Sequence, residues 1–458
     1  MPTFHKTTPI DTTPEELFAW HARQGAFERL APPWEPIRIE KRADGIEDGA
    51  VLIFKVGPGP FKLTWEAHHE GYIEGEQFRD IQKRGPFSTW EHTHRFLPDP
   101  DTEGHTALLD DAITYKLPLH PISQWVAGWF ARQMVERMFT FRHERTMHDI
   151  KRHEQFADRD RQRVAITGAS GLIGTALSSF LTTGGHQVAP ISRKKREGGI
   201  QWSPREQRLE AKELEGFDAV VHLAGESVNQ RWTSDAKERI LRSRIDGTRL
   251  ISETLANLER KPRVLISGSA IGFYGDRGDE LLTEDAEAGE GFLADVCKQW
   301  EDATAAAREA GIRVVHLRTS LVLDPSGGAL EQMLPLFKMG VGGNLGSGEQ
   351  YMSWISIDDM VSAILHILFT DSIEGPVNLA APNPVRNKEF TKTLGSVLSR
   401  PTFLPVPKFG LKLAMGSQTA DEMLLASQRV VPKALEEHGF KFAYPTLEGA
   451  LSHLLGKK

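Results

Sequence analysis

The 458-residue chain is short of the features that mark secreted and membrane proteins. It has one cysteine, Cys297, so no internal disulfide can form, which is typical of a reducing compartment. No run approaches the roughly 18 consecutive apolar residues of a membrane span. The first residues, MPTFHKTTPIDTTPEEL, lack the basic-then-apolar order of a signal peptide. We therefore expect a soluble, cytoplasmic protein with no membrane span.

A strong excess of one charge is also missing. The formal charge is −7, the pI is about 6.2 and the mean hydropathy is −0.36. Without a basic field, nucleic acid is a poor candidate partner, and a small-molecule substrate is favoured. A chain of 458 residues exceeds one ordinary hydrophobic core, so two or three domains are expected.

Alternating polar and apolar residues dominate the first 156 residues. In FKLTWEAH, Phe61, Leu63, Trp65 and Ala67 share one face, which predicts a β-strand. The segment STWEHTHRF alternates in the same way and puts Trp90, His92, His94 and Phe96 on one face. Earlier, Thr13-Pro14-Glu15-Glu16 is a capping box that predicts a short helix.

A long amphipathic helix is predicted after these strands. The segment PISQWVAGWFARQMVERMFTFRHERTMHDI spaces Trp125, Trp129, Met134, Met138 and Phe141 at mostly helical intervals. We interpret the charged stretch that follows, residues 148–163, as an interdomain linker.

Beyond residue 163 the pattern changes to apolar runs separated by helical segments. The runs VAITG, HQVAPIS, DAVVHLAG, RVLISGSA and IRVVHLR are near-continuously apolar. Strands of this kind belong to a parallel sheet covered on both faces, so the sequence predicts an α/β fold with a doubly wound parallel sheet.

A glycine-rich turn follows the first of these runs. In VAITGASGLIGTAL, Gly168, Gly171 and Gly174 form a variant of the dinucleotide fingerprint, placed between a strand and a helix start. Glycine lets the backbone approach a pyrophosphate, and the helix N-terminus supplies N–H donors. The intervening Ser170, Leu172 and Ile173 are assigned to the same cofactor site.

The next strand ends in ISRKKR, where an NAD-preferring site would carry an acidic residue. Ser192 and Arg193 stand there instead. A hydroxyl and a guanidinium bind a ribose 2′-phosphate, which a carboxylate would repel. The sequence therefore predicts NADP(H) as the cofactor.

Together these motifs resemble the extended type of the short-chain dehydrogenase/reductase superfamily, over about residues 162–400. TGASGLIG looks like its glycine motif, HLAG like the segment that lines adenine and ribose, and SGSAIGFYG like the stretch with the catalytic serine. GESVNQRWT, SRIDGTR and FLADVCKQWE are similar to an atypical branch, the nucleoside-diphosphate-sugar epimerase-like proteins of the NAD-dependent epimerase/dehydratase type. Residues 401–458 look like that branch's small C-terminal domain on the substrate side. Residues 1–156 resemble a START-like, helix-grip, polyketide-cyclase-type α+β domain that binds an apolar small molecule.

The resemblance also assigns site residues. It adds His222, Leu223, Ala224, Gly225 and Ser267 to the cofactor site. It gives Ser269 the place of the catalytic serine and Lys298 the place of the lysine that holds the ribose. It further implies a homodimer.

The catalytic tyrosine of the superfamily is absent, because Ala294 stands four residues before Lys298. Two replacements are open: Tyr274, which more often packs than donates a proton, and Glu226, as a partly buried acid or an exposed loop residue. We interpret Cys297 as a small packed residue and His222 as an orienting group.

The first domain contains histidines that could bind a metal. His92 and His94 share a strand face, and His68 and His69 are nearby in the sequence. No cysteine or clear carboxylate set completes a metal site, so no metal is predicted, and the pair is expected to line or back an apolar pocket.

Three hypotheses follow. The first is an NADP(H)-dependent oxidoreductase or epimerase-like enzyme fused to an apolar-ligand-binding domain. The second is a non-catalytic NADP(H) sensor, and the third places a cyclase or lipid-binding activity in the N-terminal domain. The retained Ser269 and Lys298 favour the first, and the missing tyrosine favours the second.

Overall fold

The computed structural model describes residues 2–43, 45–57, 62–102, 105–118, 122–195 and 198–457, with side chains omitted for residues 122–126. The chain forms two compact units. Unit 1 comprises Met1–Asp160 with Ser179–Gly185 and His453–Lys457, and unit 2 comprises Arg161–Ser178 and His186–Ser452. Residues 401–452 thus group with the rest of unit 2, and the predicted three-domain division stays a prediction.

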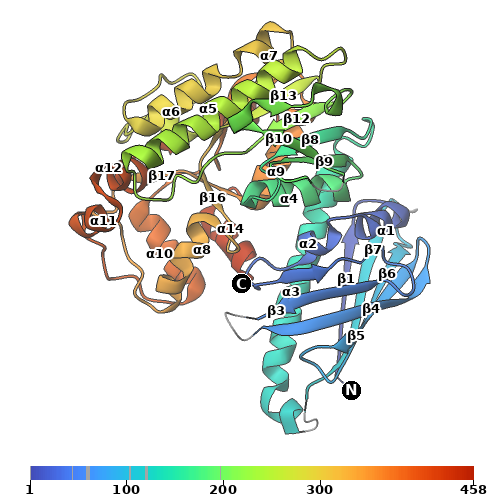
Figure 1. The fold of residues 1–458 in the computed structure, drawn as a ribbon. Helices are drawn as coiled ribbons and strands as arrows, with labels where there is room; N and C mark the ends of the chain where they lie inside the picture. The colour runs from blue at the N-terminus through green and yellow to red at the C-terminus, as the bar shows by residue number, and fades with distance from the viewer. Residues whose placement is uncertain are drawn as a thin grey trace. The chain divides into compact units, whose positions relative to one another are not determined.

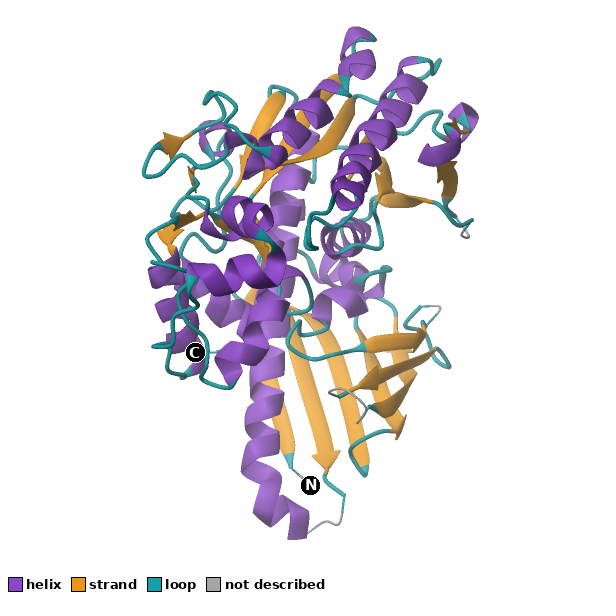
Figure 2. Ribbon diagram, turned by 60° about the vertical axis from the view of Figure 1, so that its left-hand side comes forward, coloured by secondary structure: helices purple, strands orange, loops and turns teal. Residues whose placement is uncertain are grey.

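Unit 1 is an antiparallel sheet with a long helix. The strands are β1 (Thr3–Ile10), β2 (Arg38–Lys41), β3 (Val51–Val56), β4 (Leu63–Ile73), β5 (Gln77–Arg84), β6 (Thr89–Pro98) and β7 (Ala107–Lys116). The helices are α1 (Pro14–Ala22), α2 (Ala26–Leu30) and α3 (Ile122–Glu154). The strand order is β1-β7-β6-β5-β4-β3-β2, with antiparallel neighbours throughout, and α3 runs beside this sheet (Figure 2).

The predicted strands and helix starts of unit 1 are confirmed. On β6, Trp90, His92, His94 and Phe96 are all buried while their neighbours are partly exposed, as the alternation predicts. The backbone N–H of Glu16 donates to the Thr13 hydroxyl at the start of α1, which completes the predicted cap. Phe61 lies outside the described residues.

Two features of α3 differ from the prediction. Trp129 and Met134, expected on the core face, are 73% and 39% exposed. Phe141 is buried as predicted, and the rest of the buried face includes Ala131, Val135 and Phe139. The helix also continues to Glu154, into the stretch interpreted as a linker. Two of its charged residues there, Asp149 and Arg152, are buried, and Asp149 accepts two hydrogen bonds from Arg29, at 2.7 and 2.6 Å. The charged composition of residues 148–163 suggested an exposed linker, although Asp149 within it forms a buried ion pair. Trp125 belongs to the side chains that are not described.

Unit 2 is built on a mostly parallel sheet. Its strands are β8 (Arg163–Thr167), β9 (Gln187–Ser192), β10 (Ile200–Ser203), β11 (Arg208–Leu209), β12 (Ala219–His222), β13 (Val264–Ala270), β15 (Arg313–Thr319) and β19 (Gly375–Leu379). The order is β11-β10-β9-β8-β12-β13-β15-β19, and all neighbours except β10 and β11 are parallel. This is the order of a Rossmann sheet, in which the strand order reverses between β8 and β12. The predicted doubly wound fold is confirmed.

Helices cover both faces of this sheet. Figure 1 shows α5 (Ser234–Ala256), α6 (Phe292–Asp302) and α7 (Ala305–Glu309) on one side of the parallel strands, and α4 (Leu172–Thr183) and α9 (Ile357–Phe369) on the other. Because both faces are covered, Val164, Ala165 and Ile166 of β8 have no exposed surface, which explains the continuous apolar run.

The remaining elements of the second half of the chain are short. They are β14 (Leu281–Leu282), β16 (Leu321–Leu323), α8 (Gly328–Lys338), β17 (Tyr351–Met352), β18 (Trp354–Ser356), β20 (Val385–Arg386), α10 (Asn387–Leu398), α11 (Lys408–Met415), α12 (Ser417–Ala420), β21 (Arg429–Val430), α13 (Lys433–Glu437) and α14 (Leu447–Leu455). No helix among the described residues is both long and apolar enough to cross a membrane.

Candidate functional site

The carboxyl ends of β8 and β12 are joined by one threonine. The Thr167 hydroxyl oxygen accepts hydrogen bonds from the backbone N–H groups of Leu223 and Ala224, at 3.0 and 3.1 Å, and lies 2.7 Å from His222 Nδ1. Full burial lowers the pKa of His222 to about 4, so the ring is neutral at pH 7 and Nδ1 accepts the Thr167 proton. His222 thus orients backbone and has no access to a substrate.

The glycine turn after β8 leaves no room for side chains at two of its positions. Gly168 has a φ of +68°, and a Cβ there would lie 2.9 Å from the carbonyl carbon of Leu223. A Cβ on Gly174 would lie 2.2 Å from the carbonyl oxygen of Gly168. Ser170 and Gly171 are exposed at the tip of the turn, and Leu172 and Ile173 are half-buried at the start of α4. The turn is therefore a glycine-dependent cradle at the point where the strand order reverses, where Rossmann folds bind a dinucleotide.

Ser192 and Arg193 lie beside this turn. Thr167 pairs with Ile191, so the end of β9 adjoins the end of β8. The Ser192 hydroxyl donates to the carbonyl oxygen of Lys194, at 2.5 Å, and the Arg193 side chain is exposed. This is the position at which a Rossmann fold recognises the adenosine ribose.

A buried polar row crosses the ends of the next three strands. Ser269 on β13, Arg318 on β15 and Asn378 on β19 are paired in register. The Ser269 hydroxyl donates to Glu301 Oε1 at 2.7 Å, and Arg318 donates to both oxygens of Glu301 at 3.0 Å. Ser267, earlier on β13, is fully buried.

Tyr274 belongs to the same row, and the structure argues against its role as a proton donor. Its side chain has no exposed surface, and its hydroxyl donates to Asn378 Oδ1 at 2.7 Å while accepting from Arg318 at 3.0 Å. Burial raises the pKa of Tyr274 further. The GFYG tyrosine is a packed structural residue.

Glu226 also differs from the buried acid considered above. Its side chain is 43% exposed and lies 3.9 Å from Arg239, with Gln230 donating to it at 3.5 Å. Its own backbone carbonyl accepts from Arg244, whose guanidinium lies over the Trp300 ring. The alternative, an exposed loop acid, is the one observed.

Ala294 and Lys298 lie on the same helix, α6, but one is buried and the other is exposed to solvent. Ala294 is 1% exposed, whereas Lys298 is exposed. Cys297 is 3% exposed, and burial raises the pKa of its thiol to about 11, so it is an unreactive packed residue. A tyrosine at position 294 would have to enter a packed interior, where added volume is costly.

Sequence reasoning missed Glu301, Arg318, Asn378, Glu284 and Arg244. Glu284 accepts from the backbone N–H of Asn378 at 2.9 Å, its Oε2 has no hydrogen-bond partner, and burial raises the pKa of this carboxyl. Arg244 lies in the quoted motif SRIDGTR, where its charge alone gave no reason to separate it from other helix cations.

Unit 1 contains a cavity of about 800 Å³, in the size range of small-molecule sites. Its lining is largely apolar and includes Leu63, Trp65 and Ala67, together with Trp90 of β6. His92 and His94 line it as predicted, whereas Phe96 does not.

Comparison with known proteins identifies the family. The NAD dependent epimerase/dehydratase family matches residues 164–380, and a domain of unknown function matches residues 406–454. An epimerase family protein of Mycobacterium bovis is 43% identical over 293 residues, which cover 63% of this chain and 96% of that protein. The chloroplastic homologue of epimerase family protein SDR39U1 from Arabidopsis thaliana is 38% identical, over 64% of this chain and 86% of its own length. The chain belongs to the NAD-dependent epimerase/dehydratase family.

Two solved structures extend the comparison. A nucleoside-diphosphate sugar epimerase from Corynebacterium glutamicum is 35% identical, with a TM-score of 0.82 over 99% of this chain and 90% of that one. Human epimerase family protein SDR39U1, solved with NADPH, is 32% identical, with a TM-score of 0.58 over 64% of this chain and 98% of that one. The first match extends over both units, and the second is confined to about two thirds of the chain.

The cradle can be tested through Gly174→Ala. The added methyl would collide with the Gly168 carbonyl, and forced overpacking of this kind costs about 1–3 kcal/mol. We expect a lower free energy of unfolding in urea and weaker NADPH binding by fluorescence titration. Gly410→Ala is the matched control, because its nearest neighbour, an atom of Pro407, is 3.9 Å away. Equal behaviour of the two variants would contradict the cradle.

The polar row can be tested through Glu301→Gln. The Glu301 and Arg318 side chains are 11% and 5% exposed, so the substitution leaves a buried guanidinium without its anion. Loss of one partner of a buried pair costs about 3–5 kcal/mol. Urea unfolding should show this loss, and Glu301→Gln combined with Arg318→Met should recover part of it. A single variant as stable as the wild type would refute the assignment.

Proposed function

We propose that unit 2 is an NADP(H)-dependent oxidoreductase or epimerase-like enzyme acting on a small molecule. The observation that carries the proposal is the glycine cradle at the β8–β12 reversal, with Ser192 and Arg193 beside it in place of an acidic residue. The human relative solved with NADPH supports the choice of cofactor.

Three segments of this chain would bind NADP(H). The turn 168–174 would hold the pyrophosphate through backbone N–H groups and the start of α4. Arg193 would pair with the 2′-phosphate, and the loop 222–225, fixed by Thr167, would lie along the ribose. When bound, the cofactor supplies a hydride acceptor or donor.

The proton chemistry must come from groups that are accessible. Of the four nominated catalytic residues, Ser269 and Tyr274 have their hydroxyl protons directed to Glu301 and Asn378. Lys298 and Glu226 have exposed or half-exposed head groups. We therefore assign Ser269 and Tyr274 to positioning the strand ends, and propose Lys298 and Glu226 as the residues that meet cofactor or substrate.

A second candidate is an NADP(H) sensor without turnover, which the burial of Ala294 favours. A third is ligand binding by unit 1, as a START-like domain, which the apolar cavity favours. The enzyme and the sensor share the cofactor site and differ only in whether the bound cofactor takes part in a reaction.

Cofactor choice is tested with Arg193→Asp. The wild type should bind NADPH more tightly than NADH, because the guanidinium pairs with the 2′-phosphate, and the variant should lose or reverse that preference in fluorescence titrations. Lys194→Asp makes the same charge change one residue later and should alter the preference less. Equal wild-type affinities for the two cofactors would overturn the assignment.

The role of Lys298 is tested with Lys298→Ala. Loss of one charge-assisted hydrogen bond to the ribose should weaken NADPH binding by roughly 1.5–3 kcal/mol. Any hydride-transfer rate should fall by a similar factor, and not by the far larger factor of a lost acid–base partner. Gln299→Ala, the exposed neighbour on α6, is the control. Unchanged NADPH affinity in Lys298→Ala would place the lysine outside the cofactor site.

A further inference from the structure

Two histidines and a carboxylate converge in the wall of the unit 1 cavity. Asp80 on β5 pairs in register with His92 on β6, and His94 follows two residues later on the same strand face. All three residues line the cavity. His92 and His94 are 1% and 4% exposed, and the Asp80 side chain is 24% exposed, so the carboxylate lies at the open side of the group.

The distances among the three ligand atoms suit a metal ion. Asp80 Oδ2 lies 3.4 Å from His94 Nε2 and 3.7 Å from His92 Nδ1. The three residues each offer a ligand atom within 4.8 Å of those of the other two. Ligands about 2.0–2.2 Å from a tetrahedral ion would be roughly 3.3–3.6 Å apart. The spacing therefore needs little adjustment to admit an ion.

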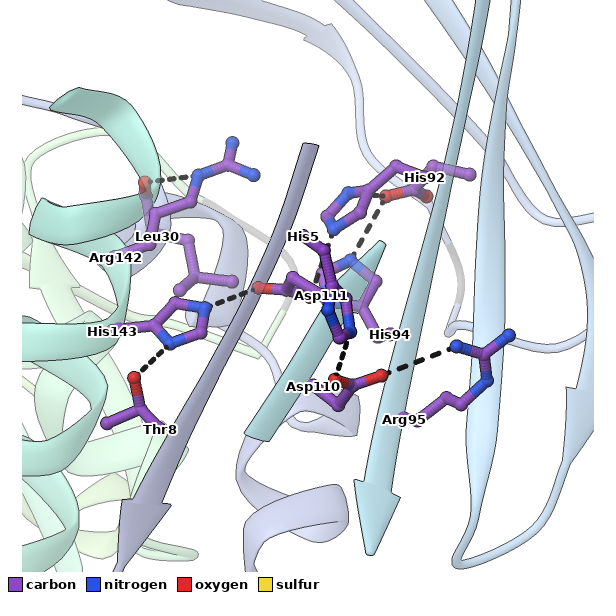
Figure 3. Close-up of polar contacts among 11 residues, drawn as sticks. His5, Thr8, Leu30, His92, His94, Arg95, Asp110, Asp111, Arg142 and His143 are labelled. Atoms are coloured by element: carbon purple, nitrogen blue, oxygen red, sulfur yellow. Dashed lines mark hydrogen bonds and ion pairs between the residues drawn. The ribbon is translucent and has the colours of Figure 1, made fainter. Parts of the chain in front are cut away.

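The outer nitrogens of both rings meet one buried carboxylate, Asp111 of β7. His92 Nε2 donates to Asp111 Oδ1 at 3.0 Å, and His94 Nδ1 lies 2.8 Å from the same oxygen. In Figure 3, Asp111 lies between these two rings and His143 of α3. His143 donates to Asp111 Oδ2 at 2.8 Å, and its other nitrogen lies 2.8 Å from Thr8 Oγ1. Metal-binding histidines normally have an outer carboxylate of this kind, which fixes the ring and its tautomer.

The charges around the group also suit a cation, because two carboxylates, Asp80 and the buried Asp111, flank the two rings. The two nitrogens that face Asp80 can bind an ion when each neutral ring directs its single N–H to Asp111. Positive charge between the two carboxylates lowers the cost of burying them. A divalent ion would balance the charges of Asp80 and Asp111. Asp80 Oδ1 lies 2.7 Å from His69 Nε2, which would hold the carboxylate in place.

We propose that Asp80, His92 and His94 bind one divalent transition-metal ion of the zinc or ferrous class. Two imidazoles and one carboxylate are the protein ligands of many catalytic zinc sites and of non-haem iron(II) sites. Calcium and magnesium prefer all-oxygen ligands, which this group does not offer. The open coordination positions face the apolar cavity, so the ion would bind a carboxylate, carbonyl or hydroxyl group of an otherwise apolar ligand.

The sequence predicts no metal here because no cysteine or clear carboxylate set accompanies the histidines in it. Asp80 is 12 residues before His92 and Asp111 is 17 residues after His94 by their numbers, and only the pairing of β5, β6 and β7 brings them together. The structure corrects that argument: it supplies one carboxylate to each side of the two rings.

The test is titration of the metal-free, tag-free full chain with Co²⁺, followed by displacement with Zn²⁺. We expect one Co²⁺ per chain, a visible d–d absorption typical of four- or five-coordinate cobalt, and loss of that absorption with Zn²⁺. Asp80→Asn and His94→Gln should abolish the absorption, and Asp111→Asn should weaken Co²⁺ binding about 10–100-fold. NADPH binding should be retained in all variants, because the substitutions lie in unit 1 and the cofactor site lies in unit 2. An unchanged far-UV circular dichroism spectrum shows that unit 1 of each variant folds.

His68→Gln is the matched control. His68 is a neighbour of His69 on β4, pairs with Glu66 at 2.8 Å and does not line the cavity, so its substitution should leave Co²⁺ binding unchanged. A wild-type chain that gives no stoichiometric Co²⁺ spectrum overturns the proposal. The group would then be a hydrogen-bonded network of histidines and aspartates without a metal. Binding that survives Asp80→Asn overturns it as well.

Discussion

Everything proposed for unit 2 depends on a close approach of backbone at one point. The turn after β8 touches the loop after β12 so tightly that Gly168 cannot carry a Cβ, and the turn itself is so tight that Gly174 cannot carry one without displacing the main chain of Gly168. Thr167 closes the same contact by accepting from Leu223 and Ala224. With these two loops fixed, the N–H groups at the start of α4 point at a defined place, and a dinucleotide can bind without reorganising the protein.

The region where the superfamily performs its chemistry is arranged for stability in this chain. Glu301, Arg318 and Asn378 take up the hydroxyl groups of Ser269 and Tyr274, and Ala294 is packed. Ser269 is thus part of a buried network around the Glu301–Arg318 ion pair. Buried charges of this kind are tolerated when each is fully paired, whereas an unpaired buried charge would destabilise the fold. We propose that any proton transfer comes from the exposed side, from Lys298, Glu226 or the substrate itself.

Local patterns predicted the fold well and the side-chain networks poorly. Apolar runs and the glycine turn indicated the Rossmann sheet, and alternation indicated β4 and β6. These predictions succeed because a buried face places apolar residues at a fixed spacing in the sequence. Partners such as Glu301 for Ser269, or Asp111 for His92, come from other elements and depend on register, which no local pattern records. The burial of Asp149 could not be predicted for the same reason. Its charged surroundings suggested a linker, because its buried partner Arg29 lies 120 residues away in the sequence.

The central claim is that NADP(H) binds across the β8–β12 reversal of unit 2. Hydrogen–deuterium exchange of the full chain, with and without saturating NADPH, tests it most directly. The account predicts slower exchange in peptides covering residues 168–174, 191–193 and 222–225, with unchanged exchange in β5 and β6 of unit 1. Protection in unit 1 without protection of the glycine turn would contradict it.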